Sequence, residues 1–304
     1  MRSAFIINGS AGGGCDQAWL ARHRDAMLAQ GGEGRITLAR NGDEIVEAVR
    51  RALQQGCDRI VAGGGDGTVS AVAAQLVGRE AALGVLPLGT LNHFAKDLNL
   101  PLDTESAFAA MRDGQVREVD IGEVNGEYFI NNSSLGLYPR IVHGREKQQR
   151  RLGRGKWPAF LWAALRTLRR YPFMDVQLNV DGRELFHRTP FVFIGNNEYR
   201  MQGLGIGARE RMDGGLLSLY LTQRTGRWGL LRLALHALAG RLHQAHDFHS
   251  LCTDSFRIDT KDDHLRVATD GEVRLMRPPL HYRVHPRALR VIVPAAAAAA
   301  GAGA

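Results

Sequence analysis

The stretch Gly63-Gly64-Gly65-Asp66-Gly67-Thr68 decides how the first third of this chain folds. The strand-like run at residues 59–62, apolar after Arg59, comes immediately before it, and apolar residues at helical spacing follow it: Val69, Val72, Ala73 and Leu76. This order predicts a buried strand, a tight glycine turn and an amphipathic helix. Glycine adopts positive φ without strain and lets other groups approach the backbone closely, so the turn is also a candidate for ligand binding.

The same order of strand, turn and helix occurs before and after this turn. Further strands are expected at residues 4–7, 35–38 and 83–86, each followed by a helix. Such alternation predicts an α/β domain with a mostly parallel sheet over residues 1–118. Ligands bind such sheets at the carboxyl ends of the strands, where the turns at 8–12, 63–68 and 87–92 would come together.

After about residue 119 the sequence changes to short strands joined by tight turns. Asn125-Gly126, Asp181-Gly182 and Asp270-Gly271 are two-residue hairpin signals. They predict a mainly antiparallel β domain over residues 119–283. Residues 284–294 are a further stretch that could return to the first domain. The Ala- and Gly-rich end, residues 295–304, has no apolar pattern to bury and is expected to be disordered.

The composition is that of a folded protein, with 304 residues, 44% hydrophobic and 23% charged. A formal charge of +8 predicts attraction to nucleic acid, an anionic membrane or a phosphate-bearing substrate. The three cysteines lack disulfide or zinc spacing and fit a reducing cytoplasm. No run approaches the ~18–20 apolar residues that span a bilayer, so we expect a cytoplasmic protein with peripheral membrane association.

Residues 140–170 are strongly basic and amphipathic. They contain ten Lys and Arg residues against one acidic residue, Glu146, and apolar residues such as Trp157 and Leu161 recur at helical spacing. A helix of this kind can lie on an anionic membrane. An equally good interpretation is a helix that packs its apolar side on the β domain and exposes its basic side to solvent. We expect no nucleic acid partner, because no recognition motif accompanies the charge; the oligomeric state stays open, a homodimer included.

The three glycine turns would together form a cradle for phosphate groups. The N–H groups at the start of each following helix supply donors and a positive dipole end. Asp66 suits a carboxylate that orients a hydrated Mg²⁺, and Thr68 suits a hydroxyl that donates to phosphate. The loop is not a Walker loop, because no Gly-Lys-Ser/Thr follows. A purely structural turn is the alternative, and it is stronger for residues 8–12 than for residues 63–68.

These motifs resemble the catalytic domain of the diacylglycerol kinase and sphingosine kinase family, in particular its bacterial lipid kinases. The resemblance rests on the order and spacing of residues 8–12, 64–68 and 86–98, and it continues more diffusely to the Asp270-Gly271-Glu272 segment. It implies ATP-dependent transfer of the γ-phosphoryl group to a lipid hydroxyl at a membrane surface. The acceptor would be diacylglycerol-like or a sphingoid base.

The resemblance also implies the residues of the site. Those near ATP would be the following: Asn8, Gly9, Ser10, Ala11, Gly12, Thr37, Gly64, Gly65, Asp66, Gly67, Thr68, Val69, Ser70, Thr90 and Asn92. Asp66 and Asp120 would hold Mg²⁺ through water. A structural Mg²⁺ would bind Asp213 and the backbone carbonyls of Glu210 and Gly215. The proton acceptor would be Asp270 or Glu272, with the choice open; plain turns are the alternative at Asp213 and at Asp270.

Two positions depart from the family pattern. His93 stands where the family usually has Asp, and Ser70-Ala71 stands where Asn-Glu is frequent. Asp97, one helical turn after His93, is a candidate replacement in the magnesium network. Two other functions are considered. One is a kinase of the NAD kinase type, which has a similar Gly-Gly-Asp-Gly turn, and the other is a non-catalytic nucleotide- or lipid-binding regulator, suggested by His93.

Overall fold

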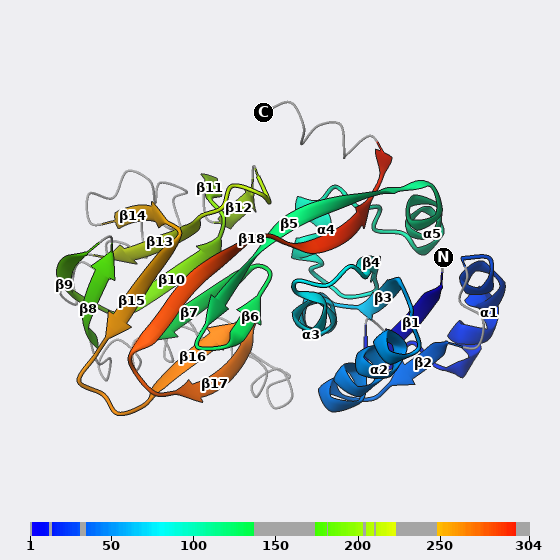
Figure 1. Ribbon diagram of the computed structural model, residues 1–304, viewed down its shortest axis with the longest axis horizontal. Coiled ribbons are helices and arrows are strands. Elements are labelled where there is room, and N and C mark those ends of the chain that lie inside the picture. The colour runs from blue at the N-terminus through cyan, green and yellow to red at the C-terminus, as the bar shows by residue number, and fades with distance from the viewer. Residues whose placement is uncertain are drawn as a thin grey trace, which may run out of the picture.

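The computed structural model describes residues 2–11, 14–30, 35–136, 174–180, 182–202, 205–209, 211–222 and 248–295 (Figure 1). The predicted basic segment 140–170 and the Ala/Gly tail from residue 296 lie outside the described residues, as do Gly12, Asp181 and Glu210. Within the described part of the chain, no helix is long and apolar enough to cross a bilayer.

The first domain contains the predicted parallel sheet. Its strands, in the spatial order β2-β1-β3-β4, are β1 (Ser3–Asn8), β2 (Ile36–Ala39), β3 (Arg59–Gly64) and β4 (Ala82–Pro87), and all neighbours are parallel. Its helices are α1 (Gln17–Leu28), α2 (Gly42–Gln54), α3 (Asp66–Leu76), α4 (His93–Asp97) and α5 (Thr104–Asp113). The prediction of an α/β domain is confirmed.

Helix α3 begins without the side-chain cap that α1, α2 and α5 have, and α4 lacks one too. The first turns of α1, α2 and α5 are each capped by a side chain, from Asp16, Asn41 and Asp103 respectively, which accepts a backbone N–H. The N-cap of α3 is Gly65, and it has no side-chain cap. The N–H groups at the start of α3 are therefore left for another acceptor.

The second domain contains a sandwich of two sheets and a separate two-stranded sheet. Its strands are β6 (Glu127–Phe129), β7 (Asn132–Gly136), β8 (Met174–Val180), β9 (Arg183–Thr189), β10 (Phe191–Asn196), β11 (Tyr199–Gln202), β12 (Gly205–Arg209), β13 (Leu217–Thr222), β14 (Phe248–Thr253), β15 (Ser255–Asp259), β16 (Leu265–Thr269) and β17 (Glu272–Met276). One sheet of the sandwich has the order β14-β13-β10-β7-β16-β17 and is antiparallel throughout. The separate two-stranded sheet is formed by β11 and β12. Buried residues of both layers, among them Leu135, Val192 and Tyr282, form one core. The predicted antiparallel domain is confirmed.

Two of the predicted hairpins have the expected turn geometry. Asn125 and Gly126, with φ of 47° and 89°, join β5 (Gln115–Val124) to β6. Asp270 and Gly271, with φ of 48° and 90°, join β16 to β17. Positive φ at both central residues is what a type I′ hairpin turn requires, which explains the choice of Asn or Asp followed by Gly.

A long two-stranded ribbon joins the domains. Strand β18 (Leu280–Val293) pairs with β5 along most of its length, with β15 in the second domain, and with β4 through Val291 and Leu83 in the first (Figure 1). Its register against β5 shifts between His285 and Leu289. The end of the chain therefore completes the first domain's sheet.

The buried Asp120 carboxylate fixes this irregularity in the ribbon. One oxygen accepts the N–H of Arg287 at 2.8 Å, and the other accepts the N–H of Gly215 at 2.6 Å. Arg287 has a φ of 52°, a conformation that few non-glycine residues adopt. Asp120 thus connects β5, β18 and the segment before β13.

Because β18 completes the core of the first domain, Leu289→Ala should destabilise the protein strongly. Leu289 is fully buried, so removal of its side chain leaves a cavity and should lower the free energy of unfolding by about 2–5 kcal/mol. Leu275→Ala is the matched control, because Leu275 on β17 is 64% exposed. Denaturant unfolding of both variants gives the comparison, and equal losses would contradict this role for β18.

Candidate active site

The second and third glycine turns contact each other through their backbones. The N–H of Leu88 donates to the carbonyl oxygen of Gly64 at 3.0 Å. A Cβ atom placed on Gly89 would lie only 2.4 Å from the Cα of Gly65. Residue 89 must therefore be glycine, whereas a Cβ on Gly65 would lie 3.4 Å from the Cα of Gly89, an ordinary contact. The two turns present their backbone at the carboxyl end of the parallel strands.

The first glycine turn is attached to α3 by side chains. Asn8 at the end of β1 donates its Nδ2 to the Oγ1 of Thr68 at 2.9 Å, and its Oδ1 accepts the N–H of Ser10 at 2.9 Å. Gly64 makes room for this arrangement, because a Cβ there would lie 2.4 Å from the Thr68 hydroxyl oxygen. The three predicted turns thus meet around the uncapped start of α3.

Asn92 and Asp66 stabilise the third turn and α4. Asn92 has a φ of 50°; its Oδ1 accepts the N–H of Gly89 at 3.1 Å, and its Nδ2 donates to the carbonyls of Pro87 and Gly89 at 3.2 and 2.9 Å. Asp66 Oδ1 accepts the N–H of Phe94 at 3.2 Å. The Asn92 side chain therefore holds the turn closed, and Asp66 ties the start of α3 to the start of α4.

Other residues predicted near ATP lie in different surroundings. Val69 is buried in the core of the first domain. Thr37 lies within β2, opposite Ile6 of β1. Thr90 is exposed on the third turn. Ser70 points towards the second domain and contacts Asp270. These positions stay predictions for the nucleotide site.

Asp270 connects the two domains. Its Oδ2 accepts the hydroxyl of Ser70 at 2.6 Å and the N–H of Ile130 at 2.8 Å, and its Oδ1 accepts the N–H groups of Asn131 and Asn132 at 2.8 and 3.1 Å. Burial raises the pKa of this carboxyl, and the hydrogen bonds from Ser70 and the three amides lower it. Burial has the larger effect, so the pKa lies above its usual value.

Glu272 lies in a different environment from Asp270, although only one residue separates them. Its side chain is 60% exposed and lies 3.6 Å from the guanidinium of Arg274. The structure therefore brings only Asp270 of this pair into contact with α3.

The predicted magnesium ligands are not gathered into one protein cage. Within the described residues, no group of three or more His, Cys, Asp or Glu side chains is placed to hold a metal ion. Asp213 lies 3.6 Å from both Arg117 and Arg211. Asp120 already accepts two backbone amides. The residues present fit an ion that keeps most of its own water and is shared with a nucleotide, rather than an ion held by protein alone.

The candidate replacement for the missing family Asp has another partner. Asp97, at the end of α4, binds the Nε of Arg209 through its Oδ2 at 2.8 Å, and the Arg209 side chain is fully buried. His93, at the start of α4, is exposed. Sequence reasoning did not identify Arg209, because its position in β12 gives no local signal of this contact.

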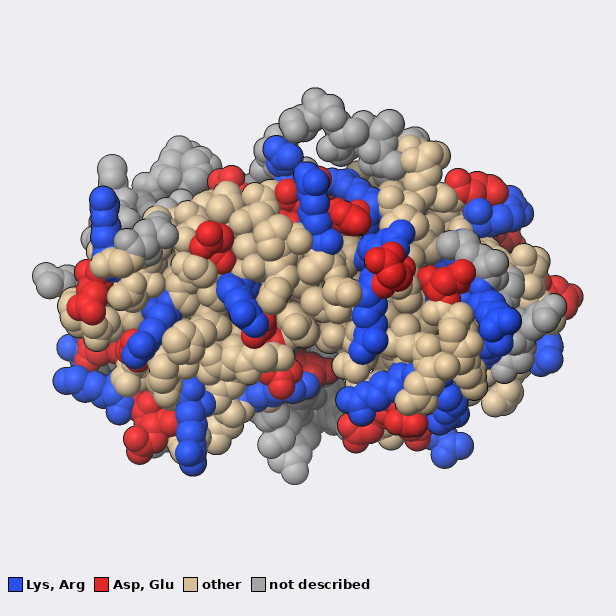
Figure 2. Space-filling view, viewed as in Figure 1, with Lys and Arg blue, Asp and Glu red and all other residues tan. Residues whose placement is uncertain are grey.

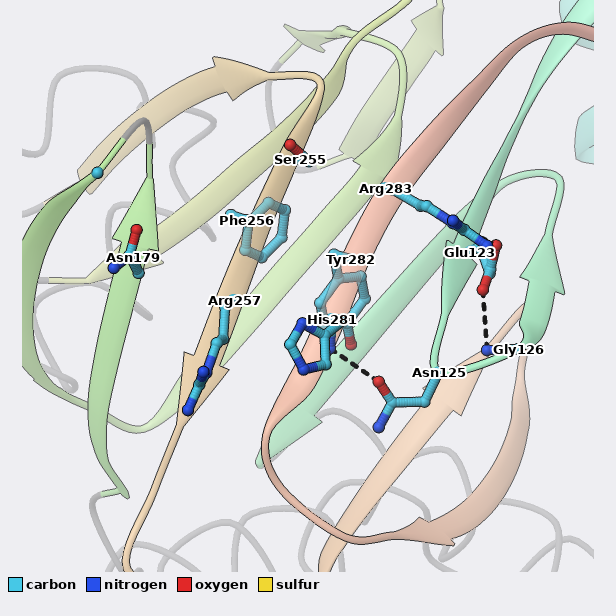
Figure 3. Close-up of a pocket in the computed structure, with 11 residues that line it drawn as sticks. Glu123, Asn125, Gly126, Asn179, Ser255, Phe256, Arg257, His281, Tyr282 and Arg283 are labelled. Carbon is cyan, nitrogen blue, oxygen red and sulfur yellow. Dashed lines mark hydrogen bonds and ion pairs between the residues drawn. The ribbon is translucent and has the colours of Figure 1, made fainter.

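A groove on the outer face of the second domain was also not predicted. It has a volume of about 730 Å³ and is lined mainly by polar side chains, including Glu123, Asn125, Arg257, His281 and Arg283 (Figure 3). Burial raises the pKa of Glu123, but hydrogen bonds from Arg283 and His285 outweigh it, so the net shift is downward. Acidic and basic side chains are interspersed over the face that Figure 2 shows, without a single-sign patch.

The glycine turns and the uncapped start of α3 lie next to a carboxylate supplied by the β-sandwich domain. Residues 2–124 match the family described as the diacylglycerol kinase catalytic domain. Residues 142–293 match the family described as the YegS C-terminal NAD kinase beta sandwich-like domain. The chain therefore belongs to the diacylglycerol kinase family of lipid kinases, and the resemblance seen in its motifs is confirmed.

Curated relatives support this assignment. A diacylglycerol kinase of Bacillus subtilis is 26% identical over 299 residues, which cover 96% of each chain. A Pseudomonas aeruginosa protein named "Probable lipid kinase YegS-like" is 42% identical over 124 residues, which cover 39% of this chain and 41% of the relative.

Solved structures show the same fold. A diacylglycerol kinase from Bacillus anthracis str. Sterne superposes with a TM-score of 0.69 at 18% identity, covering 97% of this chain and 98% of the other. Yeast NADH kinase, in complex with NADH, superposes with a TM-score of 0.53 at 12% identity, covering 96% of this chain and 83% of the other. The fold is thus shared by kinases with different acceptors.

Gly89→Ala should weaken ATP binding about tenfold, because a Cβ at this position collides with Gly65 and forces the two turns apart. Titration calorimetry with a non-hydrolysable ATP analogue measures the effect. Gly42→Ala is the control: a Cβ on Gly42 meets nothing within 4 Å, so this variant should bind as the wild type does. Wild-type affinity in Gly89→Ala would contradict the proposed cradle.

Proposed function

We propose that this protein transfers the γ-phosphoryl group of ATP to the hydroxyl of a lipid, either diacylglycerol-like or a sphingoid base. The observation that carries the proposal is the contact between Asp270 and Ser70. Ser70 lies on α3 four residues after Asp66, about 6 Å along the helix axis. The carboxylate of the second domain is therefore held close to the turn where the phosphates of ATP would bind.

The chemistry needs few protein groups. Phosphoryl transfer depends on positioning and on neutralising charge, together with a carboxylate that takes the proton of the attacking hydroxyl. The uncapped N–H groups of α3 and the glycine turns would bind the phosphates. Asp270 is our choice for the proton acceptor, because it faces α3 while Glu272 is exposed.

We also propose that Mg²⁺ accompanies ATP. This ion keeps several waters and binds through phosphate oxygens and one or two carboxylates, and it would neutralise charge on the transferred group. Asp66 is the carboxylate nearest the start of α3 and is the candidate that fits this mode. Asp120 and Asp213 are engaged with backbone amides and with arginines, so they would act on the ion at most through water.

The acceptor identity is the first point to test. The protein is incubated with γ-labelled ATP, Mg²⁺ and anionic vesicles that contain diacylglycerol or sphingosine, and in a separate reaction with NAD. Label in a lipid product is expected. Label in NADP instead would favour the NAD kinase alternative, whose fold this chain shares, and ATP binding without transfer to any acceptor would favour a regulator.

Membrane contact is part of the proposal. The lipid substrate resides in a bilayer, and the basic segment 140–170, outside the described residues, is the candidate for docking on an anionic surface. Flotation with vesicles of increasing anionic lipid content tests this directly. Binding that does not depend on the anionic fraction would oppose it.

Asp270→Asn should lower kcat about 100-fold or more, since an amide cannot accept the proton. In the wild type, activity should be lost as the pH falls through the pKa of Asp270, because only the ionised carboxylate is a base, and the raised pKa places this loss above the usual range for Asp. Glu272→Gln is the matched control and should keep most of the activity. Initial rates measured across pH compare the two variants and give the pH profile of the wild type. If Glu272→Gln lost more activity than Asp270→Asn, Glu272 would be the proton acceptor instead.

A further inference from the structure

Arg209 joins the nucleotide side of the site to the peptide groups that bind Asp270. It lies at the end of β12, and its side chain is fully buried. On one side its Nε binds Asp97 Oδ2 at 2.8 Å, at the end of α4. Helix α4 is in turn held to the phosphate turn by the bond from the Phe94 N–H to Asp66.

On its other side, Arg209 binds the segment that holds Asp270. One terminal nitrogen donates to the carbonyl of Ile130 at 2.6 Å and to that of Asn196 at 3.1 Å, and the other donates to Asn131 Oδ1 at 2.9 Å. The guanidinium carbon lies 5.5 Å from the centre of the Tyr199 ring. The hydroxyl of Tyr199 donates to the carbonyl of Asn131 at 2.9 Å.

These contacts act on the same peptide groups that bind the carboxylate. The carbonyl of Ile130 and the N–H of Asn131 belong to one amide, which receives a cation on its oxygen and donates to Asp270 through its nitrogen. The next amide receives the Tyr199 hydroxyl and donates through Asn132. A charge on the oxygen of an amide strengthens its N–H as a donor, so hydrogen bonds in series reinforce one another.

From this geometry, and resting on the proposed function, we infer that Arg209 is a positioning residue for phosphoryl transfer. It holds residues 130–132 so that their N–H groups bind Asp270, and through Asp97 it fixes that assembly to α4. Within the described residues, the ionisable groups that interact with Asp270 are Arg209, which is paired with Asp97, and Tyr199. Burial raises the pKa of Tyr199 to about 12, so its hydroxyl is neutral at working pH. Ser70 and the three amides complete its surroundings.

The inference predicts that loss of Arg209 raises the titration midpoint of Asp270, whereas loss of the Asp97 charge alone does not. Removing Arg209 takes away the cation that stabilises the Asp270 carboxylate, so the titration midpoint of Asp270 should rise. Removing only the charge of Asp97 leaves that cation in place without its counter-charge, so the midpoint should stay or fall. A residue with a purely structural role would not produce this pattern.

The test uses the full chain with ¹³C-labelled Asp carboxyls, and the Asp270 signal is assigned by its loss in Asp270→Asn. Arg209→Met combined with Asp97→Asn removes both charges, so no unpaired charge is left buried. In this protein we expect the titration midpoint of Asp270 to rise by about one pH unit. The acid limb of the pH profile of kcat should move by the same amount, and the KM for ATP should stay within about twofold of the wild-type value. Asp97→Asn should show no rise, and the exposed control Arg112→Ala should show no change.

Tyr199→Phe provides a second variant of the same segment. It removes one hydroxyl and keeps the ring, and it should raise the midpoint by a smaller amount. An unchanged midpoint in the Arg209→Met, Asp97→Asn protein would overturn the inference. If that protein does not fold, an unchanged midpoint in Tyr199→Phe overturns it instead. Because the titration needs no substrate, the expected shifts in a protein that transfers no phosphoryl group would refute only the proposed function.

Discussion

The arrangement of the site depends on the binding of one carboxylate by two domains. Asp270 accepts a hydroxyl from α3 in the first domain and three backbone amides from the second, across 200 residues of sequence. A half-buried carboxylate is stable only if its oxygens are hydrogen-bonded, so these donors must be in place together. The same requirement brings the start of α3 and the β16–β17 hairpin into one site.

Other contacts between the two domains hold these parts of the site in place. The β5 and β18 ribbon passes through both domains, and Asp120 fixes its irregular point by binding Arg287 and Gly215. Arg209 and Asp97 add a second, buried connection on the side of α4. The domains are thus joined at several points around the cradle, which suits a reaction whose rate depends on positioning two substrates.

The sequence predicted those parts of the fold and site that depend on local patterns. The alternation of apolar strands and helices gave the parallel sheet, and pairs such as Asn125-Gly126 gave hairpins, because both follow from backbone preferences. Contacts between distant segments could not be predicted. Asp97 was considered for the magnesium network from its helical spacing, but its partner Arg209 lies 112 residues away and is brought there only by the packing of β12 against α4.

The hydrogen bond between Ser70 and Asp270 should stabilise the contact between the two domains. This contribution can be measured by a double-mutant cycle with Ser70→Ala and Asp270→Ala, in which denaturant unfolding gives the free energy of unfolding of each variant. Because this hydrogen bond involves a charged acceptor, we expect a coupling energy of about 1.5 kcal/mol or more. Losses that add to within about 0.5 kcal/mol would contradict it.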